Sequence, residues 1–253
     1  MENKNKLAMF GNMANGSISQ DMLYEQAKSL LDTMLDFKEL LLRYDCAIKE
    51  IKTKFDVLNK EFEVRYQRNP ISSIHTRLKS QTSIMEKLSR LGLEMTRDNI
   101  EQNLHDIAGI RVICSYVDDI YSIADALIRQ ADITLISRKD YIKNPKPNGY
   151  RSLHLIVSVP IFFSNEVKTV LAEIQIRTIA MDFWASLEHQ IKYKKNIKNS
   201  GEIAEQLRKC AEVIAYTDRM MKDIRTKIDN EQDEKTEEEI IFEKLKKFDI
   251  NLG

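Results

Sequence analysis

The chain contains few of the residues on which several common protein classes depend. Among its 253 residues are only three cysteines, widely separated and odd in number, which argues against a disulfide framework and a zinc knuckle. The four histidines lack metal-ligand spacing. No apolar run reaches the roughly 18 residues of a membrane helix, and the first twenty residues lack the apolar segment of a signal peptide. We therefore expect a cytoplasmic protein with no membrane partner.

An excess of charge of one sign is also missing. The 39 lysines and arginines balance 39 aspartates and glutamates, so nothing in the bulk charge attracts nucleic acid or membranes. Neither a glycine-rich Walker loop nor a GxGxxG motif is present. A nucleotide site in this chain would therefore depend on separated cations and carboxylates.

Hydrophobic residues make up 43% of the chain, enough for a core, and their spacing indicates an α/β fold. Helical spacing predicts helices over residues 20–67, 80–92, 117–130, 179–195, 201–230 and 240–248. Apolar β-branched runs predict strands over 107–117, 133–142, 152–163 and 169–178. This order predicts a mixed sheet flanked by helices. We divide the chain into a flexible N-terminus (1–19), an N-terminal helical extension (20–69), a core (70–195) and C-terminal helices (196–253).

Residues 143–154, KNPKPNGYRSLH, form the most informative loop. Three cations, Lys143, Lys146 and Arg151, suit phosphates, while the prolines stiffen the chain. Gly149 allows a sharp bend or close approach, and the ring of Tyr150 offers a face to a purine. The alternative is a proline-rich surface turn between two strands.

Charged residues recur in three further segments. On a helix through residues 76–90, one face carries Lys79, Ser83, Lys87 and Arg90, which suits a polyphosphate or simply water. Asp106 precedes a predicted strand, where metal-binding carboxylates are common, and Arg111 lies inside that strand; a bulge at Gly109 would bring the two to one face. Alternation over 171–178 gives a polar face of Glu173, Gln175 and Arg177, which lines a cleft or faces solvent.

Taken together, the motifs resemble the synthetase domain of RelA/SpoT homologues in its stand-alone form, the small alarmone synthetases. The matching segments are R-L-K-S-x-x-S-x-x-x-K-x-x-R (77–90), D-I-A-G-I-R (106–111), R-K-D-Y-I (138–142), K-P-N-G-Y-R-S-L-H (146–154) and E-I-Q-I-R-T-x-A-M-D-F-W-A-S-L-E-H (173–189). The resemblance covers about residues 70–195. It implies an α/β nucleotidyltransferase-like domain with a mixed sheet of about five strands.

The resemblance also implies an activity, namely transfer of the β,γ-pyrophosphate of ATP to the 3′-hydroxyl of GDP or GTP, giving (p)ppGpp and AMP. The residues that it implies for ATP are Arg77 and Arg111 around adenine and Lys79, Ser83, Lys87 and Arg90 along the phosphates. It implies Mg²⁺ at Asp106 and Glu173, with Glu173 also the base. Those that it implies for the acceptor nucleotide are Tyr150 as the stacking ring, with Lys139, Lys146, His154, Gln175 and Asp182.

Three departures from the family pattern bear on these expectations. Asp182 stands where some relatives carry Asn, and Lys139 where some carry Arg. The segment SSIHT before Arg77 lacks the pattern linked to activation by the product. We further expect synthesis without hydrolysis, and a homotetramer. Two alternatives are another acceptor, an adenine nucleotide or the 3′ end of tRNA, and a non-catalytic nucleotide- or RNA-binding regulator. Balanced charge counts against nucleic acid, but tRNA and single-stranded RNA stay open as partners.

Overall fold

The computed structural model describes residues 20–193 and 200–233. Contacts divide the chain into two units, Met1–Arg43 and Tyr44–Gly253, and the division falls inside the first described helix, α2 (Gln20–Tyr66). In the first unit, α2 carries an exposed side-chain bond from Thr33 to the Ser29 carbonyl, 2.8 Å long. The second unit holds the sheet and the other described helices. Within the described residues, no helix is long and apolar enough to cross a membrane.

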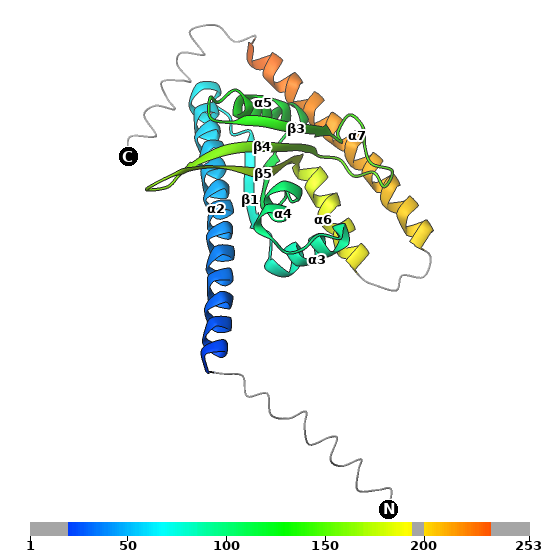
Figure 1. Ribbon diagram of the computed structural model, residues 1–253. Helices are drawn as coiled ribbons and strands as arrows, with labels where there is room; N and C mark the ends of the chain where they lie inside the picture. Colours follow the sequence, from blue (N-terminus) through cyan, green and yellow to red (C-terminus); the bar gives the residue numbers. More distant parts are fainter. Residues whose placement is uncertain (1–19, 194–199, 234–253) are drawn as a thin grey trace, which may run out of the picture. The chain divides into compact units, whose positions relative to one another are not determined.

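Five strands form one mixed sheet in the order β1-β2-β5-β4-β3 (Figure 1). They are β1 (Ile71–Leu78), β2 (Ala108–Cys114), β3 (Thr134–Asp140), β4 (Leu153–Phe162) and β5 (Val167–Thr178). Strand β2 pairs with β5 in parallel, and the other neighbours are antiparallel. The parallel pair brings segments some sixty positions apart in sequence into register. The predicted α/β fold with about five strands is confirmed.

The two faces of the sheet differ in polarity. Ile110, Ile174 and Leu155 are Cα partners across the three central strands and are buried, so one face is apolar. Helix α5 (Val117–Ile128) covers this face, where its Asp125 pairs with Arg138 of β3 at 3.1 Å. The opposite face presents residues of the other parity and is polar. The site described below lies on this polar face.

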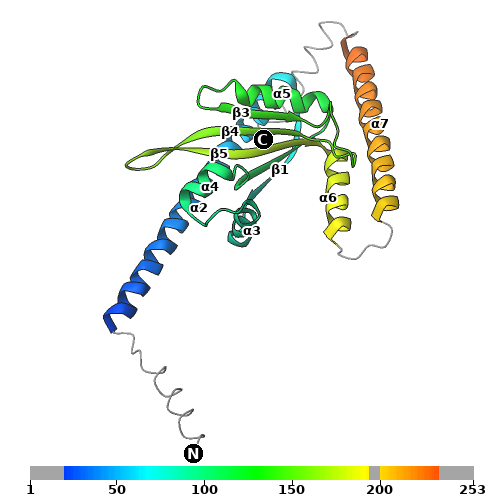
Figure 2. The same ribbon diagram turned by 45° about the vertical axis from the view of Figure 1, so that its right-hand side comes forward.

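Four more helices complete the described part of the second unit. Helix α3 (Gln81–Leu91) and α4 (Arg97–Asn103) lie between β1 and β2 in sequence. Helix α6 (Ile179–Tyr193) follows β5 directly, and α7 (Ser200–Asp233) runs beside it in the opposite direction (Figure 2). A small core of Trp184, Ala185 and Ala211 joins α6 to α7. This pair of helices supports the loop 143–150, because the ring of Tyr150 packs against the same core.

The sequence predictions differ from the structure at four places. Strand β1 was not predicted, and helix α3 begins only at Gln81 with Ser80 as its N-cap, so Lys79 lies outside the helix on which we placed it. The bulge proposed at Gly109 is wrong, because β2 keeps regular register with both neighbours from Ala108 to Val112. Helix α4 was also missed. The predicted helix over 240–248 and the loose N-terminus (1–19) lie outside the described residues.

Candidate active site

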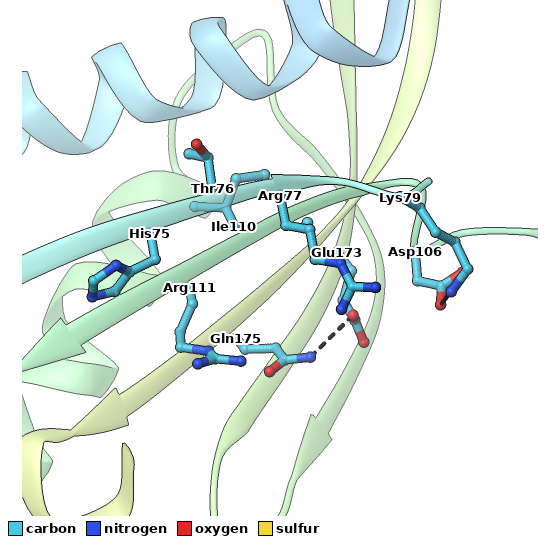
Figure 3. Close-up of a pocket in the computed structure, with 10 residues that line it drawn as sticks. His75, Thr76, Arg77, Lys79, Asp106, Ile110, Arg111, Glu173 and Gln175 are labelled. Atoms are coloured by element: carbon cyan, nitrogen blue, oxygen red, sulfur yellow. Dashed lines mark hydrogen bonds and ion pairs between the residues drawn. The ribbon is translucent and has the colours of Figure 1, made fainter. Parts of the chain in front are cut away.

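A pocket of about 390 Å³ opens on the polar face of the sheet, where β1, β2 and β5 lie side by side. Arg77, Arg111, Glu173 and Gln175 project from the same side of these strands (Figure 3). Lys79 and Asp106 close one end, and His75 lies toward the other (Figure 3). The pocket thus combines two carboxylates with three cations, a composition suited to a metal-bound polyphosphate.

Gly109 forms the floor of this pocket. Its Cα partners are Arg77 on β1 and Glu173 on β5, so it occupies the centre of a row of three residues. A Cβ atom at this position would point into the space between the two neighbouring side chains and would lie 3.3 Å from the Arg77 carbonyl oxygen. Because Gly109 has no side chain, the floor stays flat and a planar ring can approach the sheet.

Asp106 is held by two lysines. Lys79 Nζ lies 2.9 Å from one carboxylate oxygen and Lys87 Nζ lies 2.7 Å from the other. Burial alone would raise the pKa of Asp106, but the hydrogen bonds and charges of Lys87 and Lys79 outweigh it and leave the pKa below its ordinary value. Lys79 and Lys87 therefore meet at one carboxylate, although they come from different elements, the turn after β1 and helix α3.

This arrangement predicts a pH-dependent loss of stability in Asp106→Asn. The folded pKa of Asp106 is depressed, so its contribution is full above the unfolded pKa and is lost as the pH falls through the folded pKa. We expect the variant to be less stable by about 2 kcal/mol at neutral pH, because two lysines lose a charged partner. Urea melts in the presence of a chelator measure this difference. A gap between wild type and variant that persists below the folded pKa would contradict the assignment.

Glu173 also has a partner for each oxygen. Gln175 Nε2 donates to Oε2 at 3.1 Å, and His154 Nδ1 lies 3.4 Å from Oε1. Burial alone would raise the pKa of Glu173, yet His154 and Gln175 together hold the pKa below its usual value, against a smaller opposing effect of Asp106. Glu173 is thus an oriented carboxylate that stays ionised at neutral pH.

The loop 143–150 adjoins this end of the site. The Tyr150 hydroxyl lies 2.7 Å from His154 Nε2 and accepts a 2.7 Å hydrogen bond from Arg177. The Lys146 ammonium lies 4.8 Å from the centroid of the Tyr150 ring and 4.7 Å from that of Tyr141. Tyr150 of the loop and Tyr141, which precedes the loop, therefore form an aromatic pair with a cation above it. His154 connects this pair to Glu173.

Helices α6 and α7 hold the back of the loop. Asn148 donates a 3.0 Å hydrogen bond to Glu188 of α6. Gly149 has φ +91°, and a Cβ atom there would lie 2.6 Å from the Ala211 Cβ of α7. The sequence suggested that Gly149 serves a bend or a close approach, and the structure shows that the close neighbour is a helix.

Asp182, at the first turn of α6, joins the two arginines on the polar face. Its Oδ1 lies 2.9 Å from Arg177 Nη1 and 3.3 Å from Arg111 Nη1. Burial and the charge of Arg177 lower the pKa of Arg111, partly offset by Asp182. The carboxylate at position 182 thus has a structural role here, since it neutralises two neighbouring guanidinium groups.

The structure brings most of the sequence-predicted site residues together, while Ser83 and Arg90 lie apart and Lys139 lies beside His154 on the neighbouring strand. The pocket itself is lined by Arg77, Lys79, Asp106, Arg111, Glu173 and Gln175. Lys87, Tyr150, His154, Lys146 and Asp182 adjoin these residues through the contacts above. Ser83 instead takes part in the N-cap of α3, and Arg90 is exposed. Lys139, on β3, is exposed and is the Cα partner of His154 on β4.

Sequence reasoning missed two residues of this face. His75 lines the pocket as the Cα partner of Arg111, and the alternation Ser73, His75, Arg77 was a signal for it. Tyr141, which packs edge-on against Tyr150 and His154, lies inside the predicted strand 133–142 and in the matched segment R-K-D-Y-I, but it was not named as a site residue. Arg177 was recognised as part of a polar face, but its burial was not predicted.

Comparison with known proteins gives one consistent result. The model of the region found in RelA/SpoT proteins matches residues 76–198. The GTP pyrophosphokinase YwaC of Bacillus subtilis is 44% identical over 209 residues, which cover 83% of this chain and all of the relative. The crystal structure of small alarmone synthetase 2 from B. subtilis matches with a TM-score of 0.68 and 43% identity, covering 76% of this chain and 99% of the other.

A second solved structure is small alarmone synthetase 1 from B. subtilis, bound to its product pppGpp. It matches with a TM-score of 0.69 and 35% identity, over 76% of this chain and 98% of the other. Sequence and fold agree over nearly the full length of each relative. The chain therefore belongs to the RelA/SpoT family and is a homologue of its small alarmone synthetases.

Proposed function

We propose that this protein is a GTP pyrophosphokinase, which transfers the β,γ-pyrophosphoryl group of ATP to the 3′-hydroxyl of GDP or GTP and makes (p)ppGpp and AMP. The observation that carries the proposal is the juxtaposition of Asp106 and Glu173 in one cation-lined pocket, beside an aromatic loop. A binding module would not need both carboxylates at that place. Family membership points the same way, since relatives of similar length are pyrophosphokinases.

The end of the pocket near Gly109 suits the donor nucleotide. Arg77 and Arg111 lie on the same face around a flat floor, so an adenine ring fits between their guanidinium groups. Lys79 and Lys87 point to the end at Asp106, where the triphosphate would follow. Ser83 and Arg90 lie on α3 four residues before and three residues after Lys87, so both are near the same side of this helix. They keep the role of outer phosphate contacts in the proposal.

A magnesium ion is part of the proposal, with Asp106 and Glu173 as its protein ligands. Across the described residues no group of three or more His, Cys, Asp or Glu side chains is placed to hold a metal. Two carboxylates nevertheless fit, because Mg²⁺ is usually bound through one or two carboxylates together with substrate phosphates. When bound, the ion would neutralise phosphate charge and favour deprotonation of the attacking hydroxyl. Lys79 and Lys87, which pair with Asp106, would then turn to the phosphates.

The loop side suits the acceptor. The Tyr150 ring offers a stacking surface to guanine, and Lys146 and Lys139 supply positive charge for the 5′ phosphates. His154 and Gln175 stand between this ring and Glu173. Asp182 and Arg111 border the same space. A purine stacked on Tyr150 would bring its ribose toward Glu173, the place where a 3′-hydroxyl has to react.

The residues can perform the transfer without a covalent intermediate. Glu173 accepts the proton of the acceptor 3′-hydroxyl, whose oxygen forms a bond to the β-phosphorus. The bond between that phosphorus and the oxygen of AMP breaks, and AMP leaves with the electron pair. Arg77, Lys79 and Lys87 hold the phosphates in line, which is the main requirement for phosphoryl transfer.

The test is a product assay with each acceptor in turn. We expect ATP labelled in its β- or γ-phosphate, with Mg²⁺ and GDP or GTP, to give labelled (p)ppGpp and AMP in equal amounts. Preferred transfer to an adenine nucleotide or to the 3′ end of tRNA would establish a different acceptor. Tight nucleotide binding with no transfer to any acceptor would instead identify a regulator and contradict the proposal.

A homotetramer in the cytoplasm belongs to the same proposal. Helix α7 supports it, because a row of apolar side chains along this helix is exposed in the single chain, namely Val213, Tyr216, Met220, Ile224 and Ile228. Their spacing of three or four residues puts them near one side of the helix, as an interface between copies requires. Synthesis without hydrolysis also remains part of the proposal.

A further inference from the structure

A buried arginine with no assigned role stands at the centre of the acceptor side. The Arg177 side chain is 5% exposed and donates three hydrogen bonds, to Asp182 Oδ1 at 2.9 Å, Gln175 Oε1 at 2.7 Å and the Tyr150 hydroxyl at 2.7 Å. A guanidinium group has donors and no acceptor, so each partner must present an oxygen to it. Arg177 therefore determines which end of each neighbouring polar group faces it.

The first consequence concerns Gln175. An amide side chain has a carbonyl oxygen and an NH₂ group that are otherwise interchangeable in space. Because the oxygen of Gln175 is occupied by Arg177, its NH₂ group points the other way, to Glu173 Oε2 at 3.1 Å. The arginine thus makes Gln175 a donor to one oxygen of the proposed base.

The second consequence follows through Tyr150 and His154. The tyrosine oxygen accepts from Arg177, so its proton is free to go to His154 Nε2, 2.7 Å away. A histidine that accepts at Nε2 carries its proton on Nδ1, which lies 3.4 Å from Glu173 Oε1. In the opposite neutral tautomer, the N–H groups of Arg177 and of His154 Nε2 would both point to the tyrosine oxygen. The lone pair of Nδ1 would then face the Glu173 carboxylate, which is repulsive.

We propose that Arg177 is a positioning residue that fixes the direction of two hydrogen-bond relays, one through Gln175 and one through Tyr150 and His154, which end on the two oxygens of Glu173. The relays hold the carboxylate plane and keep both oxygens supplied with donors. They also tie the stacking ring to the base, so Tyr150 and Glu173 are oriented by the same group. This inference rests on the proposed function for the role of Glu173 as the base. The relays themselves are hydrogen bonds of the protein without its substrates.

A direct test is the tautomer of His154. Histidine labelled with ¹⁵N, in the presence of a chelator and at about pH 8, above the ordinary histidine pKa of about 6.5, reports which ring nitrogen carries the proton. His154→Gln assigns the signal among the four histidines. We expect Nδ1–H in the wild type and a mixture of tautomers in Arg177→Lys, because an ammonium group cannot reach three acceptors in the same geometry. A wild-type Nε2–H tautomer would overturn the inference.

Kinetics supply the second readout. We expect Arg177→Lys to lower kcat by about 10- to 100-fold, the usual effect of removing a group that orients a functional ligand, with the KM for ATP unchanged. Tyr150→Phe keeps the ring and the Arg177–Asp182 ion pair, so it tests one relay even if Arg177→Lys fails to fold. Combining the two substitutions should cost less than the product of the single effects, since both interrupt one path. The inference would be overturned if the two single effects on kcat multiplied fully in the double variant, or if Arg177→Lys left kcat unchanged.

Arg138→Lys is the matched control. Arg138 pairs with Asp125 of α5 on the other face of the sheet, so the tautomer and kcat should stay as in the wild type. The two proposals fail in different ways. If the wild type makes no product with any acceptor, the proposed function is wrong, and the tautomer of His154 still decides whether the relays exist.

Discussion

Glu173→Gln is expected to lower kcat by about 1,000-fold, within the range that a general base contributes, while nucleotide binding is largely kept. The amide has the size of the carboxylate but accepts no proton at neutral pH. It also has one acceptor oxygen where the carboxylate has two, so either Gln175 or His154 would face an NH₂ group. Both the proton transfer and the local hydrogen bonds are therefore impaired by one substitution.

Single-turnover product formation and equilibrium binding of a non-hydrolysable ATP analogue measure the two effects separately. The matched control is Glu166→Gln, which removes the same charge from the β4–β5 connection, where Glu166 pairs with Lys168 at 2.7 Å. This variant should transfer pyrophosphate at the wild-type rate. A Glu173→Gln protein that keeps a tenth or more of wild-type kcat would show that another group takes the proton.

The second large effect is expected at Gly149. A Cβ atom there meets Ala211 of α7 at 2.6 Å, and φ is +91°, so Gly149→Ala combines a clash with an unfavourable backbone conformation. We expect undocking of the loop at a cost of about 3 kcal/mol, the sum of the usual costs of the two effects. Because Tyr150 follows directly, the KM for the acceptor should rise strongly while the KM for ATP stays nearly constant.

Two further variants separate the causes. Gly92, the C-cap of α3, has φ +70° and nothing within 4 Å of an added Cβ, so Gly92→Ala carries the backbone cost alone. Adding Ala211→Gly to Gly149→Ala removes the clash between the two Cβ atoms and should restore part of the acceptor affinity. No recovery in the double variant would mean that α7 does not hold the loop.

The central strands were predictable because their apolar residues alternate or run together. The segments around Ile110, Leu155 and Ile174 are rich in β-branched side chains that only a buried sheet explains. Strand β1 was not predicted, since ISSIHTRL is largely polar and its conformation depends on pairing with β2 along an edge of the sheet. The local sequence pattern cannot indicate a pairing strand that lies thirty or more residues away.

The candidate site shows the same limit. The carboxylates and cations were predicted from their motifs, but the sequence did not place Lys79 and Lys87 on one carboxylate, because they come from a turn and a helix whose relative position is tertiary. The role of Gly149 was inferred only in part for the same reason. Its close approach is to a helix that begins fifty residues later. The burial of Arg177 depends on α6 and the loop together.

The turn between β4 and β5 sets the pairing register of these strands at the site, although it lies at their far end. Phe162 and Val167 are the last Cα partners, and the Phe163 amide donates to the Glu166 carbonyl oxygen at 2.8 Å across the connection. The number of residues in the turn therefore determines that His154 pairs with Gln175, two residues along β5 from Glu173. Changing the turn by a single residue would slip this pairing and could turn one strand's side chains to the other face. The length of this turn is therefore constrained, because a changed length would misplace His154 relative to Gln175 and Glu173 at the other end of the hairpin.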